Sequence, residues 1–378
     1  MKMLQLKGMS AQWGQTIHDN SNVIYNLGIR NGLAGFALFF YYRSEKFKRK
    51  EDEEAFYEFF EECIDRFNRG YRHEAWLFDL TDLIYLIHET RPRLAKVYDV
   101  HELLIQLAGS LESGVKELLE NQIFDPFIGA FYPAFCFMSE YPDHSLLKVL
   151  RDALIDHSQI DSDGLHYFNS CFAGEKIYLS IGHGLSAYIA FLSNYLEIYP
   201  DDDKVKHLLE NFLKFIMKQR KEADFPCFFG DFVGDKNVSS LSLCYGDCGI
   251  LYALLKGAKI TQNCSIYEEA TLMAIATGRR SLDRMEVQND VSLLYGASGM
   301  YLYFDLIGEI CNNDFLTKVG AKWKIRTYSL LSQNIEAMIA MDKSRLFKLM
   351  SFQEGVTGAF GSLLSDNKAL FLKIHHLN

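Results

Sequence analysis

Six uncharged, mainly apolar runs stand out along the chain, and each is long enough to begin a helix. A glycine precedes each run, and in four copies a second glycine follows three residues after the first. The leading glycines are Gly32, Gly129, Gly184, Gly246, Gly296 and Gly355. A helix that is apolar on all sides is buried in a globular protein. The pattern therefore predicts six buried helices that begin near these glycines.

The spacing of the leading glycines indicates one more buried helix. Successive glycines are 97, 55, 62, 50 and 59 residues apart, so the first gap is nearly twice as long as the others. The apolar run 78–88 lies within that gap and has no glycine pair. The chain is thus expected to contain seven repeats of roughly 50 residues. Their inner helices are expected to start near residues 32, 80, 129, 184, 246, 296 and 355.

Amphipathic segments separate the apolar runs. In 100–118 and 205–216 the apolar residues follow one another at intervals of three and four, which is typical of a helix with one buried face. Buried helices that alternate with amphipathic ones predict two layers. We expect an all-α protein whose seven helix pairs close into an α/α toroid, with residues 1–378 forming one domain. An open α-solenoid would show the same alternation.

Composition and charge narrow the classes of function. The 378 residues are 49% hydrophobic and 23% charged, which excludes intrinsic disorder. The net charge of −10 argues against a general nucleic-acid binder, because such proteins need a basic surface for the phosphates. The same charge is compatible with a neutral or basic peptide partner.

The sequence also predicts the compartment. Its first residues contain no apolar core of signal-peptide length, and no window contains 18 consecutive apolar residues. The eight cysteines are scattered and are expected to be reduced, mostly buried thiols. They are Cys63, Cys136, Cys171, Cys227, Cys244, Cys248, Cys264 and Cys311. We therefore expect a cytoplasmic protein with no transmembrane segment, and we expect His375 and His376 to lie in a surface tail.

Residues just before each inner helix are expected to project at one mouth of the barrel, where chemistry would collect. The polar or reactive candidates there are Asp125, His183, Cys244, Tyr245, Asp247, Tyr295 and Glu354. Helix N-termini at the same mouth would add free backbone N–H groups.

These segments resemble the lanthionine synthetase C-like cyclases. The resemblance is carried by 181–184 (IGHG), 243–249 (LCYGDCG), 293–299 (LLYGASG) and 352–358 (FQEGVTG), with a weaker match at 124–129 (FDPFIG). The Cys-Tyr-Gly segment is the most specific, followed by Gly-His-Gly. Through the number and order of repeats, the resemblance covers nearly the whole chain.

The resemblance implies a chemistry. Members of this family close rings in ribosomal peptides by adding a cysteine thiol to dehydroalanine or dehydrobutyrine, which gives a thioether. In typical members a zinc ion binds the thiol and lowers its pKa. The zinc ligands are the cysteine of the Cys-Tyr-Gly segment and a Cys-His pair one repeat later. A histidine then protonates the enolate as a general acid.

Only part of the family's site is present. By this resemblance Cys244 matches the first zinc ligand, Tyr245 the tyrosine beside it, His183 the acid/base histidine and Asp125 the aspartate that orients the site. These four are the candidate catalytic residues.

Other positions depart from the family's pattern. Leu294 and Tyr295 occupy the positions of the second and third zinc ligands, and Ser240 occupies the position of a usual arginine. Catalytic zinc normally needs three protein ligands, so we expect no cofactor unless other residues such as Cys248 rebuild the site. Tyr295, Glu354 and Asp247 are the candidates for substrate binding.

The sequence thus predicts a zinc-independent thioether cyclase that acts on a dehydrated precursor peptide, with His183 as the base and a lanthipeptide dehydratase as a candidate partner. One alternative is a non-catalytic relative that binds a modified peptide, its leader or the dehydratase. A second alternative is an α/α-barrel glycoside hydrolase, which needs two carboxylates. Its candidates are Asp82, Asp125, Asp247 and Glu354. The hydrolase does not explain the Cys-Tyr-Gly and Gly-His-Gly segments.

Overall fold

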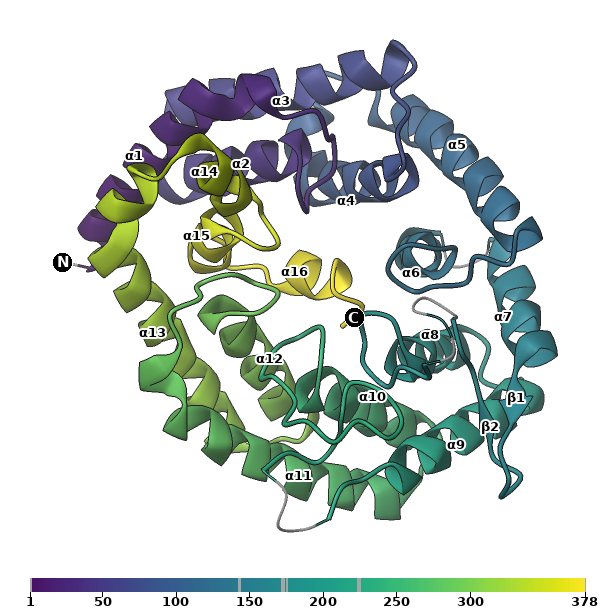
Figure 1. Cartoon of the computed structure of the whole chain (residues 1–378). Coiled ribbons are helices and arrows are strands. Elements are labelled where there is room, and N and C mark those ends of the chain that lie inside the picture. The colour runs from purple at the N-terminus through teal and green to yellow at the C-terminus, as the bar shows by residue number, and fades with distance from the viewer. Residues whose placement is uncertain (1, 142–143, 171–173, 175, 223–225, 378) are drawn as a thin grey trace. The chain divides into compact units, whose positions relative to one another are not determined.

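The computed structural model describes residues 2–141, 144–170, 174, 176–222 and 226–377, and these residues are mainly helical (Figure 1). Cys171 lies outside the described residues. Each apolar run lies in a helix, including the run without glycines. These helices are α2 (Leu33–Phe47), α4 (Trp76–Leu94), α6 (Phe131–Glu140), α8 (Leu185–Ile198), α10 (Asp247–Ile260), α12 (Ala297–Ile310) and α15 (Val356–Leu364).

A second set of helices alternates with them along the chain. They are α1 (Lys2–Asn20), α3 (Lys50–Asn68), α5 (Val100–Glu120), α7 (Leu146–His157), α9 (Asp203–Lys218), α11 (Cys264–Asp283) and α13 (Asp314–Ile339). Short elements complete the described chain: η1 (Ser21–Val23), the antiparallel strands β1 (Gln159–Ile160) and β2 (His166–Tyr167), η2 (Met285–Val287), α14 (Lys343–Met350) and α16 (Ala369–Lys373).

The two kinds of helix differ in burial as their hydropathy predicts. Every residue from 185 to 196 of α8 is buried, so this helix has no solvent face. In α9 the predicted apolar stripe from Val205 to Ile216 is buried, and the residues between its members include exposed lysines. An apolar stripe covers a neighbouring helix, whereas an apolar surface on all sides must be enclosed. The alternation therefore produces an inner and an outer layer.

The chain divides into two compact units. Unit 1 consists of Met1–Leu111, Val287–Leu302 and Lys322–Phe371, and unit 2 of Glu112–Glu286, Tyr303–Ala321 and Leu372–Asn378. In unit 1, α2 packs against α1, α3, α4 and α15. In unit 2, α10 packs against α8, α9 and α11, and α8 also packs against α6 (Figure 1). One domain over residues 1–378 stays a prediction.

Glycine is required at the helix starts because loops lie close to them. A Cβ atom at Gly184, the N-cap of α8, would overlap the carbonyl group of Tyr178 in the loop that leads into the same helix. A Cβ atom at Gly249 in α10 would lie 2.8 Å from the Ile181 side chain of the preceding repeat. The first glycine of a pair thus lets the preceding loop pack against the start of the helix, and the second lets a side chain of the neighbouring repeat pack there.

Backbone hydrogen bonds join successive loops in unit 1. They involve the residue two positions before each cap glycine. The Leu294 N–H donates to the Gln353 carbonyl at 3.0 Å, and the Gln353 N–H donates to the Arg30 carbonyl at 3.0 Å. The Arg30 N–H has a side-chain acceptor, the Asp82 carboxylate at 3.0 Å. Asp82 belongs to α4, the inner helix that lacks the glycine pair.

The C-terminal histidines differ from the prediction. His375 and His376 are 4% and 2% exposed, so they do not form a surface tail. The His376 ring lies 4.3 Å from the Phe135 ring and 5.3 Å from the Tyr132 ring, both of α6 in the same unit. Their polarity suggested exposure, but the imidazole ring packs as an aromatic group.

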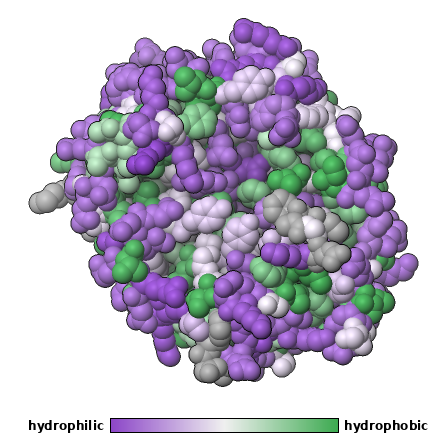
Figure 2. All heavy atoms as spheres, in the orientation of Figure 1, coloured by the Kyte–Doolittle hydropathy of each residue, from purple (hydrophilic) through white to green (hydrophobic). Residues whose placement is uncertain are grey.

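The surface is mainly hydrophilic on the face shown in Figure 2, where hydrophobic residues form small separate groups. Within the described chain, no helix combines the length and hydropathy needed to cross a bilayer. Of the seven described cysteines, five are buried, Cys264 is exposed and Cys311 is half-buried.

Candidate functional site

The loops before the inner helices share a serine that fixes their shape. The serine lies four positions before the cap glycine, and its hydroxyl oxygen accepts a hydrogen bond from the backbone N–H just before that glycine. The accepting and donating residues are Ser242 and Tyr245 at 3.1 Å, Ser292 and Tyr295 at 3.3 Å, and Ser351 and Glu354 at 3.0 Å. The repeated bond gives the residue before each glycine a defined place.

Asp125 occupies the corresponding position in the loop before Gly129. Its Oδ1 atom accepts hydrogen bonds from the N–H groups of Phe127 at 2.8 Å and Ile128 at 2.9 Å. The carboxylate therefore forms the turn that serine forms in three other repeats. A carboxylate also adds a negative charge, which the turn does not need.

That charge meets the imidazole of His183. The His183 Nδ1 atom lies 3.0 Å from Oδ1 and 3.2 Å from Oδ2 of Asp125, and the two residues are 6% and 2% exposed. This contact assigns a hydrogen to Nδ1, so Nε2 is the ring nitrogen that can exchange a proton. The rings of Phe127, Tyr178 and Tyr245 surround the imidazole at 5.4, 6.4 and 6.2 Å.

The Gly-His-Gly and Cys-Tyr-Gly segments lie side by side in unit 2. The Gly182 N–H donates to the Cys244 carbonyl at 3.2 Å. A Cβ atom at position 182 would overlap the Sγ atom of Cys244, so only glycine fits there. Cys244 is 4% exposed, and Tyr245 is half-buried. The structure thus brings together four predicted residues, Asp125, His183, Cys244 and Tyr245.

Asp247, a residue predicted to bind substrate, lies among hydrogen-bond and ion-pair partners of the protein itself. It is fully buried, and its carboxylate accepts the N–H groups of Phe228 and Phe229 at 2.9 to 3.2 Å. Arg280 of α11 forms an ion pair with it at 3.0 Å. Burial raises the pKa of Asp247, although the guanidinium and the N–H groups act in the opposite direction. Asp247 thus anchors the 228–229 loop to the start of α10.

The other two predicted binding residues belong to unit 1. Tyr295 is 36% exposed. Glu354 is half-buried, and its carboxylate lies 3.4 Å from the Lys348 ammonium group. The hydrogen bond from the Leu294 N–H to the Gln353 carbonyl joins the loops that contain Tyr295 and Glu354. The two side chains therefore belong to neighbouring loops.

The residues present do not fit the zinc ion that the resemblance implies. Cys244 supplies one thiol, whereas Leu294 has no ligand atom and Tyr295 is not a usual zinc ligand. Cys248 is fully buried in α10, and burial raises the pKa of its thiol well above the ordinary range. Among the described residues, no three His, Cys, Asp or Glu side chains form a group that could hold a metal ion.

Ser170 is a site residue that sequence reasoning missed. Its Oγ atom lies 3.2 Å from Oδ2 of Asp125 and 3.0 Å from the His183 carbonyl oxygen. Ser170 lies between β2 and α8, outside the repeated loops, so repeat comparison gives no signal for it. The serine four positions before Gly246, Gly296 and Gly355, in contrast, could have been found by aligning the repeats.

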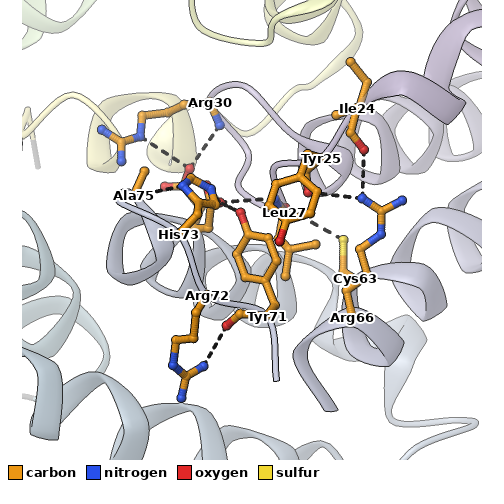
Figure 3. A network of polar contacts seen from close by, with 12 residues as sticks. Ile24, Tyr25, Leu27, Arg30, Cys63, Arg66, Tyr71, Arg72, His73 and Ala75 are labelled. Atoms are coloured by element: carbon orange, nitrogen blue, oxygen red, sulfur yellow. Dashed lines mark hydrogen bonds and ion pairs between the residues drawn. The ribbon is translucent and has the colours of Figure 1, made fainter. Parts of the chain in front are cut away.

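A second polar network in unit 1 holds the loop that leads to α2 (Figure 3). The Asp79 carboxylate contacts the Leu27 N–H at 3.2 Å, the Tyr71 hydroxyl at 2.5 Å and the His73 Nε2 atom at 3.2 Å. Asp82 forms its ion pair with Arg30 beside it. Both carboxylates hold a loop, as Asp247 does.

This environment bears on the hydrolase alternative. Asp82 and Asp247 are buried in ion pairs with arginines, and Asp125 is taken by backbone groups and His183. Glycoside hydrolases place two carboxyl groups where each can reach the scissile bond. All four carboxylates considered for that reaction thus have protein partners, since Glu354 is paired with Lys348.

Comparisons with known proteins agree with the motifs. No curated protein matches the chain in sequence. A solved structure titled "Nisin cyclase" matches with a TM-score of 0.75 at 16% identity, covering 98% of this chain and 96% of that chain, which shows the α/α toroid fold. The family model described as "Lanthionine synthetase C-like protein" matches residues 23–369. Because that match spans nearly the whole sequence, the chain belongs to the lanthionine synthetase C-like family.

Proposed function

We propose that this protein is a peptide cyclase that forms thioether rings without zinc. The observation that carries the proposal is the buried Asp125–His183 pair beside Cys244 and Tyr245. Family membership supports a peptide substrate. The substrate would be a dehydrated precursor peptide, and the enzyme that dehydrates it would be a partner.

The proposed reaction needs one proton acceptor that later becomes a proton donor. Nε2 of His183 takes the proton from the peptide cysteine. The thiolate sulfur then attacks the β-carbon of dehydroalanine, so a C–S bond forms and the electrons of the C=C bond move toward the carbonyl oxygen. The α-carbon takes the proton back from the imidazolium, which returns His183 to its neutral form. Atoms and charge balance without an oxidant or a reductant.

Asp125 supports this cycle through its charge. Three other repeats form the same turn with serine, so the turn alone does not require a carboxylate. An anion on the Nδ1 side orients the imidazole and stabilises the imidazolium that forms when Nε2 takes a proton. Cys244 and Tyr245 would border the reacting atoms from the neighbouring loop.

The test uses a purified dehydrated peptide that contains one cysteine. Ring closure leaves the peptide mass unchanged but removes the thiol, so alkylation followed by mass spectrometry counts uncyclised peptide. We expect His183→Ala to lower the rate by about 10²-fold or more, since general acid–base catalysis supplies that much. His166→Ala is the control, because this half-buried histidine contacts Ser158 in the same unit and should keep full activity.

Asp125→Ser separates catalysis from folding. The variant keeps the serine turn of the other repeats and loses only the charge beside His183. We expect an unchanged melting temperature within about 3 °C and at least a tenfold lower rate. Full activity in both His183→Ala and Asp125→Ser would contradict the proposed mechanism.

A non-catalytic relative is the second candidate. Leu294 and Tyr295 in the positions of two zinc ligands favour it, because loss of both is expected when selection on the chemistry relaxes. Such a protein would bind the dehydrated peptide in a calorimetric titration but would leave its thiol open to alkylation at the uncatalysed rate.

A further inference from the structure

The Asp125–His183 pair has a third member that no repeat motif supplies. Ser170 is half-buried and comes from the segment between β2 and α8. Its hydroxyl lies within hydrogen-bond distance of two acceptors, Oδ2 of Asp125 at 3.2 Å and the His183 carbonyl oxygen at 3.0 Å. One side chain therefore contacts both halves of the pair.

The contact between Ser170 and Asp125 matters because the Asp125 carboxylate is buried and needs hydrogen-bond donors. Its Oδ1 atom already accepts two backbone N–H groups, and both oxygens share the His183 Nδ1 hydrogen. The Ser170 hydroxyl is an additional hydrogen-bond donor to Oδ2. A buried carboxylate is stabilised when its oxygens accept hydrogen bonds, and the Ser170 hydroxyl adds one such donor to Asp125.

The second acceptor fixes the backbone of the histidine. A serine hydroxyl has one hydrogen and can donate it to only one acceptor at a time. When it points to the His183 carbonyl, it holds the chain from which the imidazole projects. When it points to Oδ2, it holds the carboxylate that orients the same ring. Both orientations constrain the direction of Nε2.

We propose that Ser170 is a positioning residue that sets the orientation of the His183 imidazole toward the peptide. The proposal rests on the proposed function for its effect on rate, but its geometric part concerns the free protein alone. Small errors in the position of a catalytic group cost large factors in rate, and binding depends on them less.

The test compares Ser170→Ala with Ser170→Thr and Ser158→Ala. Threonine keeps the hydroxyl and should rescue the alanine variant. Ser158 is a matched control in the same unit, because its hydroxyl also contacts a backbone carbonyl, that of Ile155, and a histidine nitrogen, Nδ1 of His166, both at 3.0 Å. Circular dichroism melts confirm that each variant is folded.

Two measurements separate positioning from bulk structure. The first is the steady-state rate on the dehydrated peptide, for which we expect Ser170→Ala to lower kcat about tenfold with KM changed less than twofold. The second is the 15N signal of the His183 ring in the free protein, which reports the fraction of the Nδ1–H form. We expect that fraction to fall in Ser170→Ala and to recover in Ser170→Thr, while Ser158→Ala changes neither measurement.

The outcomes distinguish the two proposals. An unchanged kcat together with an unchanged His183 15N signal in Ser170→Ala overturns the role of Ser170. An altered 15N signal with a His183→Ala variant that remains fully active overturns the proposed function and leaves the positioning contact intact. A fall in kcat that threonine does not rescue, without a change in the ring signal, also overturns the positioning role.

Discussion

At position 182 two loops of unit 2 are in contact, and a Cβ atom there would overlap an atom of the other loop. The obstacle is the Sγ atom of Cys244; the next atom, the Cys244 carbonyl oxygen, is 3.5 Å from the place of a Cβ atom. Gly182 precedes His183 directly, so a displaced backbone would also move the imidazole. The glycine of the Gly-His-Gly segment is therefore explained by the cysteine of the Cys-Tyr-Gly segment.

Gly182→Ala is expected to lower the free energy of unfolding by about 1–3 kcal/mol, because the added methyl group overpacks the contact with Cys244. Cys244→Ala removes the sulfur, so the double variant should be nearly as stable as Cys244→Ala alone. Urea unfolding of the four proteins gives the coupling free energy. Gly109→Ala is the control, since nothing lies within 4 Å of its Cβ position. Additive effects of the two substitutions would show that the sulfur is not the obstacle.

At the scale of elements, the buried Asp247–Arg280 pair joins three of them. Asp247 is the first residue of α10, Arg280 lies in the last turn of α11, and the N–H groups of Phe228 and Phe229 come from the loop between α9 and α10. The Asp247 side chain is fully buried and that of Arg280 is 15% exposed. Removing one partner of a buried pair leaves the other charge uncompensated.

Arg280→Met is expected to cost about 3–5 kcal/mol of unfolding free energy at neutral pH. Burial already raises the pKa of Asp247 in the folded protein, and loss of the guanidinium would raise it further. In the folded variant the pKa of Asp247 lies above its ordinary value of about 3.9, so Asp247 takes up a proton as the pH falls through that raised pKa. Because the protonated side chain has no buried charge, the loss of unfolding free energy should shrink over this pH range. Urea unfolding of both proteins at pH 7.5 and pH 4.5 measures this difference, and an equal cost at both would contradict it.

The elements were predictable because they depend on local hydropathy, whereas the contacts between them were not. The apolar run 78–88 was placed as a helix without its glycines, and α4 contains it. Asp125 and His183 were found through motifs that end at a glycine. Ser170 was missed because its partners are 45 and 13 residues away and it lies in no repeat. The ion pair of Asp247 was also not foreseen, because its partner, Arg280, is in another helix.

At the scale of the whole molecule, the fold is that of the family, and the prediction that depends on the resemblance concerns the zinc ligands. The match to the nisin cyclase structure covers 98% of this chain, so that prediction does not depend on a missing segment. The repeat after Cys244 supplies Leu294 and Tyr295, and Leu294 is 3% exposed with its N–H bonded to Gln353. The loop that contains Leu294 and Tyr295 is thus held by a backbone hydrogen bond to the neighbouring loop.

Zinc content is the corresponding prediction for the intact protein. Mass spectrometry of metal in purified, tag-free protein should give well below one zinc per chain, because Cys244 alone binds zinc weakly. Cys244→Ala should have the same metal content. One zinc per chain that disappears in Cys244→Ala would contradict the prediction and would restore the zinc–thiolate mechanism.

The bond between Arg30 and Asp82 has a consequence for how the repeats can change during evolution. The two neighbouring hydrogen bonds in unit 1, from Leu294 to Gln353 and from Gln353 to Arg30, have backbone carbonyl oxygens as acceptors. Every amino acid provides this oxygen, so no amino-acid substitution can remove these acceptors. The link to α4 ends on a carboxylate, and one nucleotide change at codon 82 can remove it. The repeat without the glycine pair therefore depends on an acceptor that a single substitution can remove, whereas the neighbouring loops depend on acceptors that every amino acid supplies.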